Sequence, residues 1–175
     1  MKQLNLFAQH EKKDNNGNLK KKDNLHYWRL FIDGASRNNP GPAGVGIVIL
    51  KDDKPVEKHG FFIGSKTNNQ AEYLALILGL IIITSLMDPD HLLLITSDSE
   101  LLVKQIKGSY KVKNPDLRPL FIAAQQLLVD LNYDIGHVLR HNNKQADKLA
   151  NIGIDKKIDV PSNIKEALKA YEISL

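Results

Sequence analysis

The 175-residue sequence contains no cysteine. This absence excludes disulfides, thiol catalysis and cysteine zinc sites, and it is in keeping with a reducing compartment. The N-terminus has neither the apolar run of a signal peptide nor the arginines of a mitochondrial presequence. The most apolar stretch, residues 74–87, is too short to span a bilayer and is interrupted by Gly79, Thr84 and Ser85. We therefore expect a cytoplasmic protein with no membrane contact.

The composition is that of an ordinary globular protein, with 42% hydrophobic and 25% charged residues. The length suits one domain with a sizeable core. The net charge is +4, and residues 1–24 contribute +3 of it with six lysines against three acids. A basic tail on a near-neutral body suits contact with an anionic polymer, although charge alone favours a merely solubilising tail.

Three segments are predicted along the chain. Residues 1–25 are rich in Asn, Lys and Asp and show no apolar period, so we expect a disordered tail. Residues 26–155 are expected to form the folded domain. Residues 156–175 are expected to form a C-terminal extension that contains a helix.

The apolar pattern predicts five strands, the first three joined by short links. These strands are residues 27–32, 44–50, 54–63, 92–96 and 134–140. Five helices are also expected. The first runs from a cap at Asn68 or Asn69 to Met87, and the second covers residues 99–107. The third runs from Asn114-Pro115 to Leu131, the fourth from a cap at Asn142 or Asn143 to Gly153, and the last covers residues 164–171. The order βββαβααβα, plus a C-terminal helix, predicts an α/β fold with a five-stranded mixed sheet flanked by helices.

Four acids lie where the predicted secondary structure changes. Asp33 ends the first strand and Asp98 ends the fourth, while Glu72 and Asp147 lie in the first turns of two helices. If the first and fourth strands pair in parallel, Asp33 and Asp98 lie side by side at their carboxyl ends, the edge where ligands bind in open α/β sheets. Crowded carboxylates repel one another unless they are protonated or bind a metal ion, and Mg²⁺ prefers such oxygen ligands.

Each acid alone also has a structural interpretation. Glu72 suits the positive end of a helix dipole, Asp98 suits a helix cap, and Asp147 suits a solvated surface. The case for a shared site therefore depends on the sequences around all four acids.

Those surroundings resemble the motifs of the type 1 ribonuclease H (ribonuclease HI-like) family. The similar segments are 31–44 (FIDGASRNNPGPAG), 67–73 (TNNQAEY), 96–101 (TSDSEL) and 137–150 (HVLRHNNKQADKLA). They occur in family order at family-like spacing, and the resemblance covers about residues 27–152. It implies the ribonuclease H-like fold, which agrees with the element order above.

The resemblance also implies an endoribonuclease that hydrolyses the RNA strand of RNA–DNA hybrids. It implies two Mg²⁺ ions, with Mn²⁺ as a substitute, and products that carry a 5′-phosphate and a 3′-hydroxyl without a covalent enzyme intermediate. The implied metal ligands are Asp33, Glu72, Asp98 and Asp147.

The same resemblance assigns substrate contacts. It implies that Asn39 and Asn68 contact RNA 2′-hydroxyls and that Thr67 contacts a DNA phosphate. Asn69, like the other two asparagines, carries donors and acceptors suited to 2′-hydroxyls and base edges. The alternative is that these asparagines serve only turn and cap chemistry. We expect the hybrid to be the partner, with no obligate protein partner and a monomeric state.

Three departures from the family pattern affect these expectations. His141 stands where many relatives have Glu, and it suits proton transfer or product release as well as a plain loop position. Glu100 stands where some relatives have Gln, so it receives no role, and His137 is interpreted as structural. The basic insertion of some relatives is missing between the helices after Asp98. We therefore expect weak, salt-dependent hybrid affinity, with nearby charge from Lys104, Lys107, Lys111 and Lys113.

The main alternative function is a catalytically silent hybrid- or nucleic-acid-binding module of the same fold. A proofreading exonuclease is less favoured, because such enzymes usually place a second acid two residues after the first, where this chain has Ala35. An adaptor protein leaves the asparagines and glycines around the acids unexplained, and the chain is too short for a reverse transcriptase.

Overall fold

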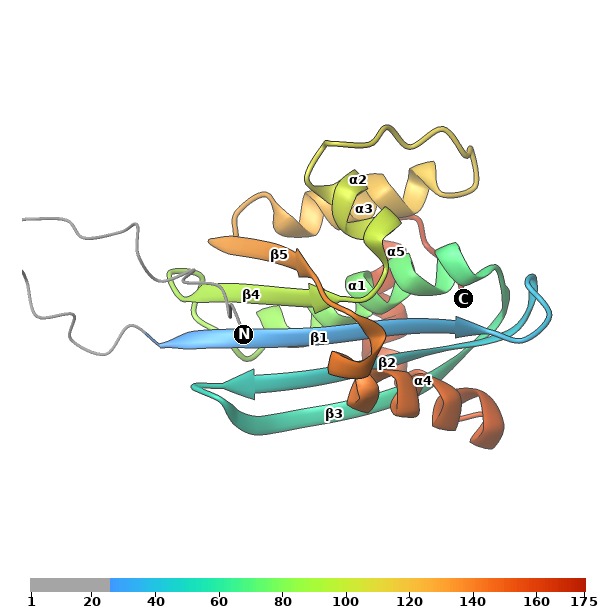
Figure 1. Ribbon diagram of the computed structural model, residues 1–175, viewed down its shortest axis with the longest axis horizontal. Helices are drawn as coiled ribbons and strands as arrows, with labels where there is room; N and C mark the ends of the chain where they lie inside the picture. The colour runs from blue at the N-terminus through green and yellow to red at the C-terminus, as the bar shows by residue number, and fades with distance from the viewer. Residues whose placement is uncertain (1–25) are drawn as a thin grey trace, which may run out of the picture.

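The computed structural model describes residues 26–175, so the predicted disordered tail lies outside the described residues. Five strands form one mixed sheet in the order β3-β2-β1-β4-β5 (Figure 1). The strands are β1 (Tyr27–Ser36), β2 (Gly41–Lys51), β3 (Lys54–Lys66), β4 (Leu92–Ser97) and β5 (Tyr133–His137). The helices are α1 (Asn68–Thr84), α2 (Glu100–Ile106), α3 (Arg118–Leu128), the 3-10 helix η1 (Arg140–Asn142), α4 (Lys144–Lys156) and α5 (Ser162–Lys169). The predicted fold class is confirmed.

The pairing of β1 and β4 fixes the position of two of the four acids. The strands run in parallel, with Ile32 opposite Ser97. Asp33 is the next residue of β1 and Asp98 directly follows β4, so both acids lie at the same carboxyl edge of the parallel pair. The three N-terminal strands form an antiparallel meander, in which Asp33 lies opposite Gly46 of β2.

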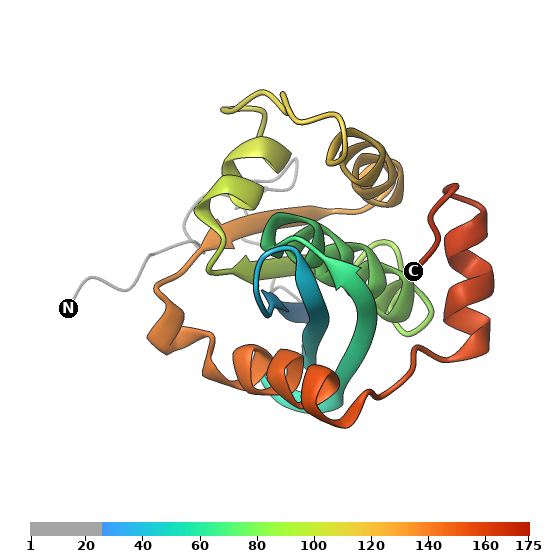
Figure 2. The ribbon, with the colours of Figure 1, turned by 90° about the vertical axis from the view of Figure 1, so that its right-hand side faces the viewer.

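Helices cover both faces of the sheet (Figures 1 and 2). One face packs against α1, which is buried along most of its length because α3 and α5 cover its other sides. This burial explains the almost continuous apolar sequence of α1. The other face packs against α4, which crosses β2 and β3. Among residues 26–175, no helix is long and apolar enough to cross a membrane.

Several predicted helix boundaries are wrong, since α1 ends at Thr84 and not at Met87, and α3 ends at Leu128 and not at Leu131. Thr67, and not Asn68 or Asn69, caps α1, because its hydroxyl accepts from the backbone of Gln70 in a capping box. α3 begins at Arg118 because the Asn114 side chain accepts from the Asp116 backbone at 2.8 Å and so forms a separate turn.

The end of α4 was also predicted wrongly, at Gly153. The helix continues through this glycine to Lys156. A Cβ at Gly153 would lie 2.6 Å from the Phe61 carbonyl oxygen, so the glycine permits close packing of α4 on β3 and does not end the helix.

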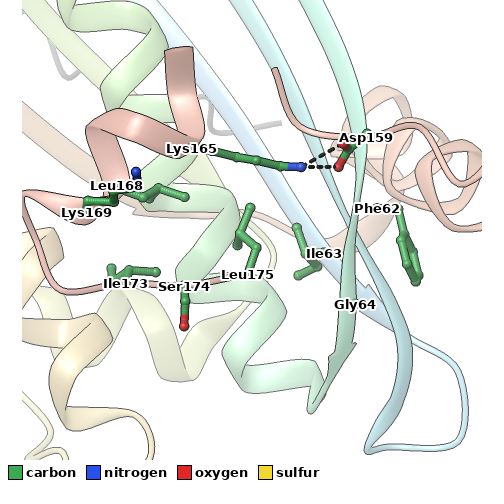
Figure 3. A pocket seen from close by; sticks show the side chains of 10 residues that line it. All are labelled: Phe62, Ile63, Gly64, Asp159, Lys165, Leu168, Lys169, Ile173, Ser174 and Leu175. Atoms are coloured by element: carbon green, nitrogen blue, oxygen red, sulfur yellow. Dashed lines mark hydrogen bonds and ion pairs between the residues drawn. The ribbon is translucent and has the colours of Figure 1, made fainter. Parts of the chain in front are cut away.

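The C-terminal segment adds a further layer beside α1 and along the edge strand β3. The Phe62 amide donates to the Ile158 carbonyl at 2.7 Å, which gives this edge strand a backbone partner. A cavity of about 380 Å³ separates the segment from β3. Figure 3 shows its apolar walls, Ile63 on one side and Leu168 and Ile173 on the other, with the Lys165–Asp159 ion pair at its rim.

Candidate active site

Three of the four predicted acids converge at the carboxyl edge of β1 and β4. Asp33, Glu72 and Asp98 each offer a carboxylate oxygen, and these oxygens all lie within 4.8 Å of one another. Asp98 directly follows β4 and Glu72 comes from α1, while Asp33 lies within β1 and does not end it as predicted, because β1 continues to Ser36. Glu72 lies beyond the first turn of α1, and not within it as predicted.

A close approach of two backbones brings Glu72 to the two aspartates. A Cβ added to Gly34 would lie 2.2 Å from the backbone nitrogen of Glu72, so only glycine permits α1 to pack this closely on β1. The Gly34 backbone also forms a hydrogen bond with the Glu72 carboxylate. The glycine that follows Asp33 therefore holds the third acid in place.

The three acids are crowded in a largely buried setting. Asp33 is 4% exposed and Glu72 is 5% exposed. Burial, followed by the negative charges of Asp98 and Asp147, raises the pKa of Asp33 to about 7. Burial, followed by the charge of Asp33, raises the pKa of Glu72 well above its usual range. Ionising this cluster at neutral pH is therefore unfavourable unless positive charge enters it.

The same cluster leaves carboxylate oxygens without partners. Asp33 Oδ2 and Glu72 Oε2 are buried, and neither forms a hydrogen bond within the described part of the chain. Buried polar atoms usually have partners, so these two oxygens are exceptions that are free to bind a ligand. A hard divalent cation fits this set of donors, because the three carboxylates supply the oxygen ligands that it prefers. Its positive charge also offsets the repulsion between the carboxylates.

Asn143 links the cluster to α4 in a way that the sequence did not predict. Its side-chain amide donates to the Ile32 carbonyl at 2.8 Å and to Asp98 Oδ1 at 2.9 Å. The residue is 1% exposed and precedes α4, but its side chain does not cap that helix. The sequence signal was its position in the motif around Asp147, which was interpreted as a helix cap. Asn143 instead orients Asp98.

Asp147, the fourth predicted acid, lies in the first turn of α4 as expected, but outside the cluster of three. Its carboxylate accepts from two guanidinium nitrogens of Arg140, with the Nε contact at 3.2 Å. The Arg140 side chain is 75% exposed and the Asp147 side chain 28%. Sequence analysis assigned no role to Arg140, although it lies within the fourth motif.

His141 lies in η1, beside Arg140, and is exposed. It lines a cavity of about 370 Å³ whose floor includes Phe31, Val48 and Leu50. Phe31 is two residues before Asp33 on β1, but the cavity also reaches Asp53 and Pro55 at the β2–β3 turn, and none of the four acids lines it. The histidine has no hydrogen bond to the acids among the described residues, and it lies two residues before Asn143, whose side chain contacts Asp98.

The predicted substrate-contacting residues gather at the start of α1. Asn39 Oδ1 accepts from the Asn68 backbone amide at 2.7 Å, which ties the β1–β2 turn to the helix. Asn39, Asn68 and Asn69 are all exposed. Thr67 is half-buried and its hydroxyl serves the capping box. The Asn39 side chain therefore has an anchoring role, and all three asparagines are exposed to solvent.

Comparison with known proteins supports a single family. The family model described as "Reverse transcriptase-like" matches residues 31–153. Ribonuclease H from Alcanivorax borkumensis is 36% identical over an alignment of 142 positions that covers 73% of this chain and 91% of that protein. Ribonuclease HI from Halobacterium salinarum is 42% identical over an alignment of 127 positions that covers 71% of this chain but only 63% of that protein.

Solved structures agree with these relatives. The crystal structure of RNase H1 from Halobacterium salinarum superposes with a TM-score of 0.71 at 40% identity, covering 74% of this chain and 98% of that one. LC11-RNase H1, solved in complex with an RNA/DNA hybrid, superposes with a TM-score of 0.70 at 36% identity, covering 74% of this chain and 97% of that one. The fold, the acid cluster and these similarities together show that the chain belongs to the type 1 (ribonuclease HI-like) branch of the ribonuclease H family of hydrolases.

Proposed function

We propose that this protein is an endoribonuclease that hydrolyses the RNA strand of RNA–DNA hybrids with two bound Mg²⁺ ions. Mn²⁺ is the expected substitute, and the products carry a 5′-phosphate and a 3′-hydroxyl. The observation that carries this proposal is the set of three crowded carboxylates whose ligand atoms lie within 4.8 Å of one another. The hybrid-bound relative supports the choice of substrate.

In this proposal Asp33, Glu72, Asp98 and Asp147 hold the metal ions. When bound, the ions would stabilise negative charge on the attacking and leaving oxygens of the phosphodiester. Two further residues act by positioning these acids. Asn143 fixes Asp98 through its 2.9 Å hydrogen bond, and Arg140 holds Asp147 at the edge of the cluster.

Recognition of RNA is assigned to the polar groups at the start of α1. Asn39, Asn68 and Asn69 are exposed and offer amide donors and acceptors to 2′-hydroxyls, which distinguish RNA from DNA. Thr67 is assigned to a DNA phosphate. His141 is assigned to proton transfer or product release, because it is exposed in η1, the segment that leads into Asn143 and so to Asp98.

The catalytic domain in this proposal is residues 26–155, with residues 156–175 as an extension and residues 1–25 as a tail. The protein is proposed to act as a monomer. A catalytically silent binding module of the same fold is the outcome to be distinguished from it.

The test is a cleavage assay with one end-labelled RNA in three forms: paired with DNA, paired with RNA, and single-stranded. Each form is incubated with Mg²⁺, with Mn²⁺ and with chelator, and product ends are mapped by phosphatase and ligase treatment. The proposal expects metal-dependent cutting in the hybrid alone, with 5′-phosphate ends. Hybrid binding without cutting in any metal would establish the silent module instead.

A further inference from the structure

The cavity of about 370 Å³ between the sheet, η1 and the start of α4 lies outside the carboxylate cluster, since none of the four acids lines it. Its floor is apolar. Phe31 of β1 lies opposite Val48 of β2, and Leu50, two residues farther along β2, is on the same face of the sheet. The predicted substrate contacts are at the start of α1, which covers the other face (Figures 1 and 2). A volume of this size suits a small organic ligand.

The N-terminus of α4 borders this cavity. Lys144, Gln145 and Ala146, the first three residues of the helix, all line it. The backbone amides of a first turn have no partner inside their own helix, and no side chain caps α4. Within α4, the first amide with a backbone acceptor is that of Asp147, which donates to the Asn143 carbonyl at 3.1 Å. Uncapped amides at the positive end of a 13-residue helix suit a phosphate group.

The side-chain charges around this helix end also favour an anion. Lys144 is exposed and forms no ion pair with any residue from 26 to 175. Two acids are near, but both already have cationic partners. Asp147, in the first turn of α4, pairs with Arg140, and Asp53, which lines the cavity, pairs with Arg29 at 3.0 Å. The charge of Lys144 is therefore available to an anionic ligand.

A buried acceptor gives a second, independent indication of a ligand. Asn143 lines the cavity and is 1% exposed, and its Oδ1 is buried without a hydrogen-bond partner among residues 26–175. The amide nitrogen of this side chain already donates to Ile32 and to Asp98. Buried polar atoms usually have partners, so Oδ1 is suited to accept from a donor on a ligand. An ionised phosphate has no such donor, but the amino group of a nucleobase is one.

We propose that this cavity binds a free nucleoside 5′-monophosphate whose base carries an amino group, as adenine and cytosine do. The phosphate binds the first-turn amides of α4 and Lys144, and the base packs on the apolar floor. The amino group donates to Asn143 Oδ1. The inference does not depend on the proposed function. Because Asn143 also orients Asp98, the bound nucleotide lies one side chain away from the carboxylate cluster.

The test is the binding of adenosine 5′-monophosphate to the full chain, measured by isothermal titration calorimetry in chelator. The chelator prevents metal ions from holding the phosphate at the carboxylate cluster. Adenosine, inorganic phosphate and purine riboside 5′-monophosphate, which lacks the amino group, are titrated in the same buffer. We expect each of these three to bind at least about tenfold more weakly, because each lacks at least one of the proposed contacts.

Two lysine variants of α4 form a matched pair. Lys144→Ala removes a charge at the cavity, and Lys148→Ala removes the same charge from an exposed position one turn later, outside the cavity. We expect Lys144→Ala to raise the Kd for adenosine 5′-monophosphate about threefold to fivefold, and Lys148→Ala to leave it within about twofold. Leu50→Trp fills the cavity and should raise the Kd more than about tenfold. Melting temperatures show whether each variant folds, and the exposed lysine pair decides the matter if Leu50→Trp does not.

The amide NMR signals of residues 144–146 locate the bound nucleotide. Saturable binding that shifts these signals, and that weakens in Lys144→Ala but not in Lys148→Ala, supports the site. No saturable binding up to about 10 mM nucleotide, or equal affinity of the two lysine variants, would overturn it. Equal affinity for adenosine 5′-monophosphate and inorganic phosphate would also overturn the inference, because the base would then make no contact. Neither result bears on hybrid cleavage, which is measured separately with metal ions.

Discussion

The two ends of β1 hold carboxylates in opposite electrostatic settings. At its start, Asp52 accepts from His26 at 2.7 Å and from the Tyr27 amide at 3.2 Å, and these bonds hold its pKa below the usual range. Asp53 pairs with Arg29 at 3.0 Å. At its other end, Asp33 faces other acids and its pKa rises to about 7.

This contrast separates acids that serve the fold from acids that do not. The paired, exposed acids at the β2–β3 turn fasten the start of β1 to the hairpin. The crowded acids at the carboxyl edge oppose folding at neutral pH because their ionised forms repel one another in a buried site. An arrangement that is unfavourable for stability is typical of a functional site.

The largest expected effect comes from Asp98→Asn. The amide has nearly the same shape but is a poor Mg²⁺ ligand, so we expect kcat to fall by at least about 10³-fold. Hybrid binding and the melting temperature should change little. Asp53→Asn is the matched control from the other end of β1 and should remain active. Full activity in Asp98→Asn would remove Asp98 from the site.

The next effect concerns Asn143, whose side chain links Asp98 to the backbone of β1 at Ile32. Asn143→Ala removes the donors to Ile32 and Asp98, and we expect kcat to fall by about 10-fold to 100-fold. The loss of two hydrogen bonds, of which the one to Ile32 is buried, should also destabilise the protein by about 1–3 kcal/mol. Kinetics and denaturant unfolding check both effects. A stability loss with unchanged kcat would make Asn143 purely structural.

The third prediction uses the sign of the pKa shift at Asp33. Its pKa in the folded state, about 7, exceeds the unfolded value of 3.8, so its stabilising contribution is present below pH 3.8 and is lost as pH rises through 7. Asp33→Asn cannot ionise. In chelator we expect its melting temperature to exceed that of the wild type by about 5 °C at pH 8 and to match it near pH 4.

The Asp52→Asn variant tests a pKa shift of the opposite sign. Its lowered pKa means that ionised Asp52 stabilises the fold above the unfolded pKa, and this contribution is lost as pH falls. The variant should therefore melt slightly below the wild type at pH 8 and approach it in acid. If both variants shift the melting temperature in the same direction at pH 8, the contrast between the ends of β1 is wrong.

The smallest expected effect is that of His141→Ala. We expect a several-fold decrease in kcat, since His141 has no hydrogen bond to the four acids among the described residues and therefore contributes less than the acids themselves. The pH dependence of kcat between pH 6 and 9 should flatten. An unchanged rate throughout this range would make His141 an ordinary loop residue.

The fold and the acid cluster were largely predictable from sequence, because apolar runs define buried strands and the parallel pairing of β1 with β4 brings Asp33 beside Asp98. The contacts between side chains were less predictable. Local chemistry allowed Asn143 to cap a helix, but tertiary packing turned its side chain toward Asp98. Similarly, only the folded chain shows that Arg140 pairs with Asp147 or that Tyr110 remains exposed.

The most direct measurement of the central claim is Mn²⁺ binding by isothermal titration calorimetry at pH 7.5, with wild type, Asp98→Asn and Asp53→Asn. If the crowded acids form the metal site, the wild type and Asp53→Asn bind Mn²⁺ alike, and Asp98→Asn loses most of the affinity. Equal binding by all three proteins, or loss of binding in Asp53→Asn alone, would contradict this account.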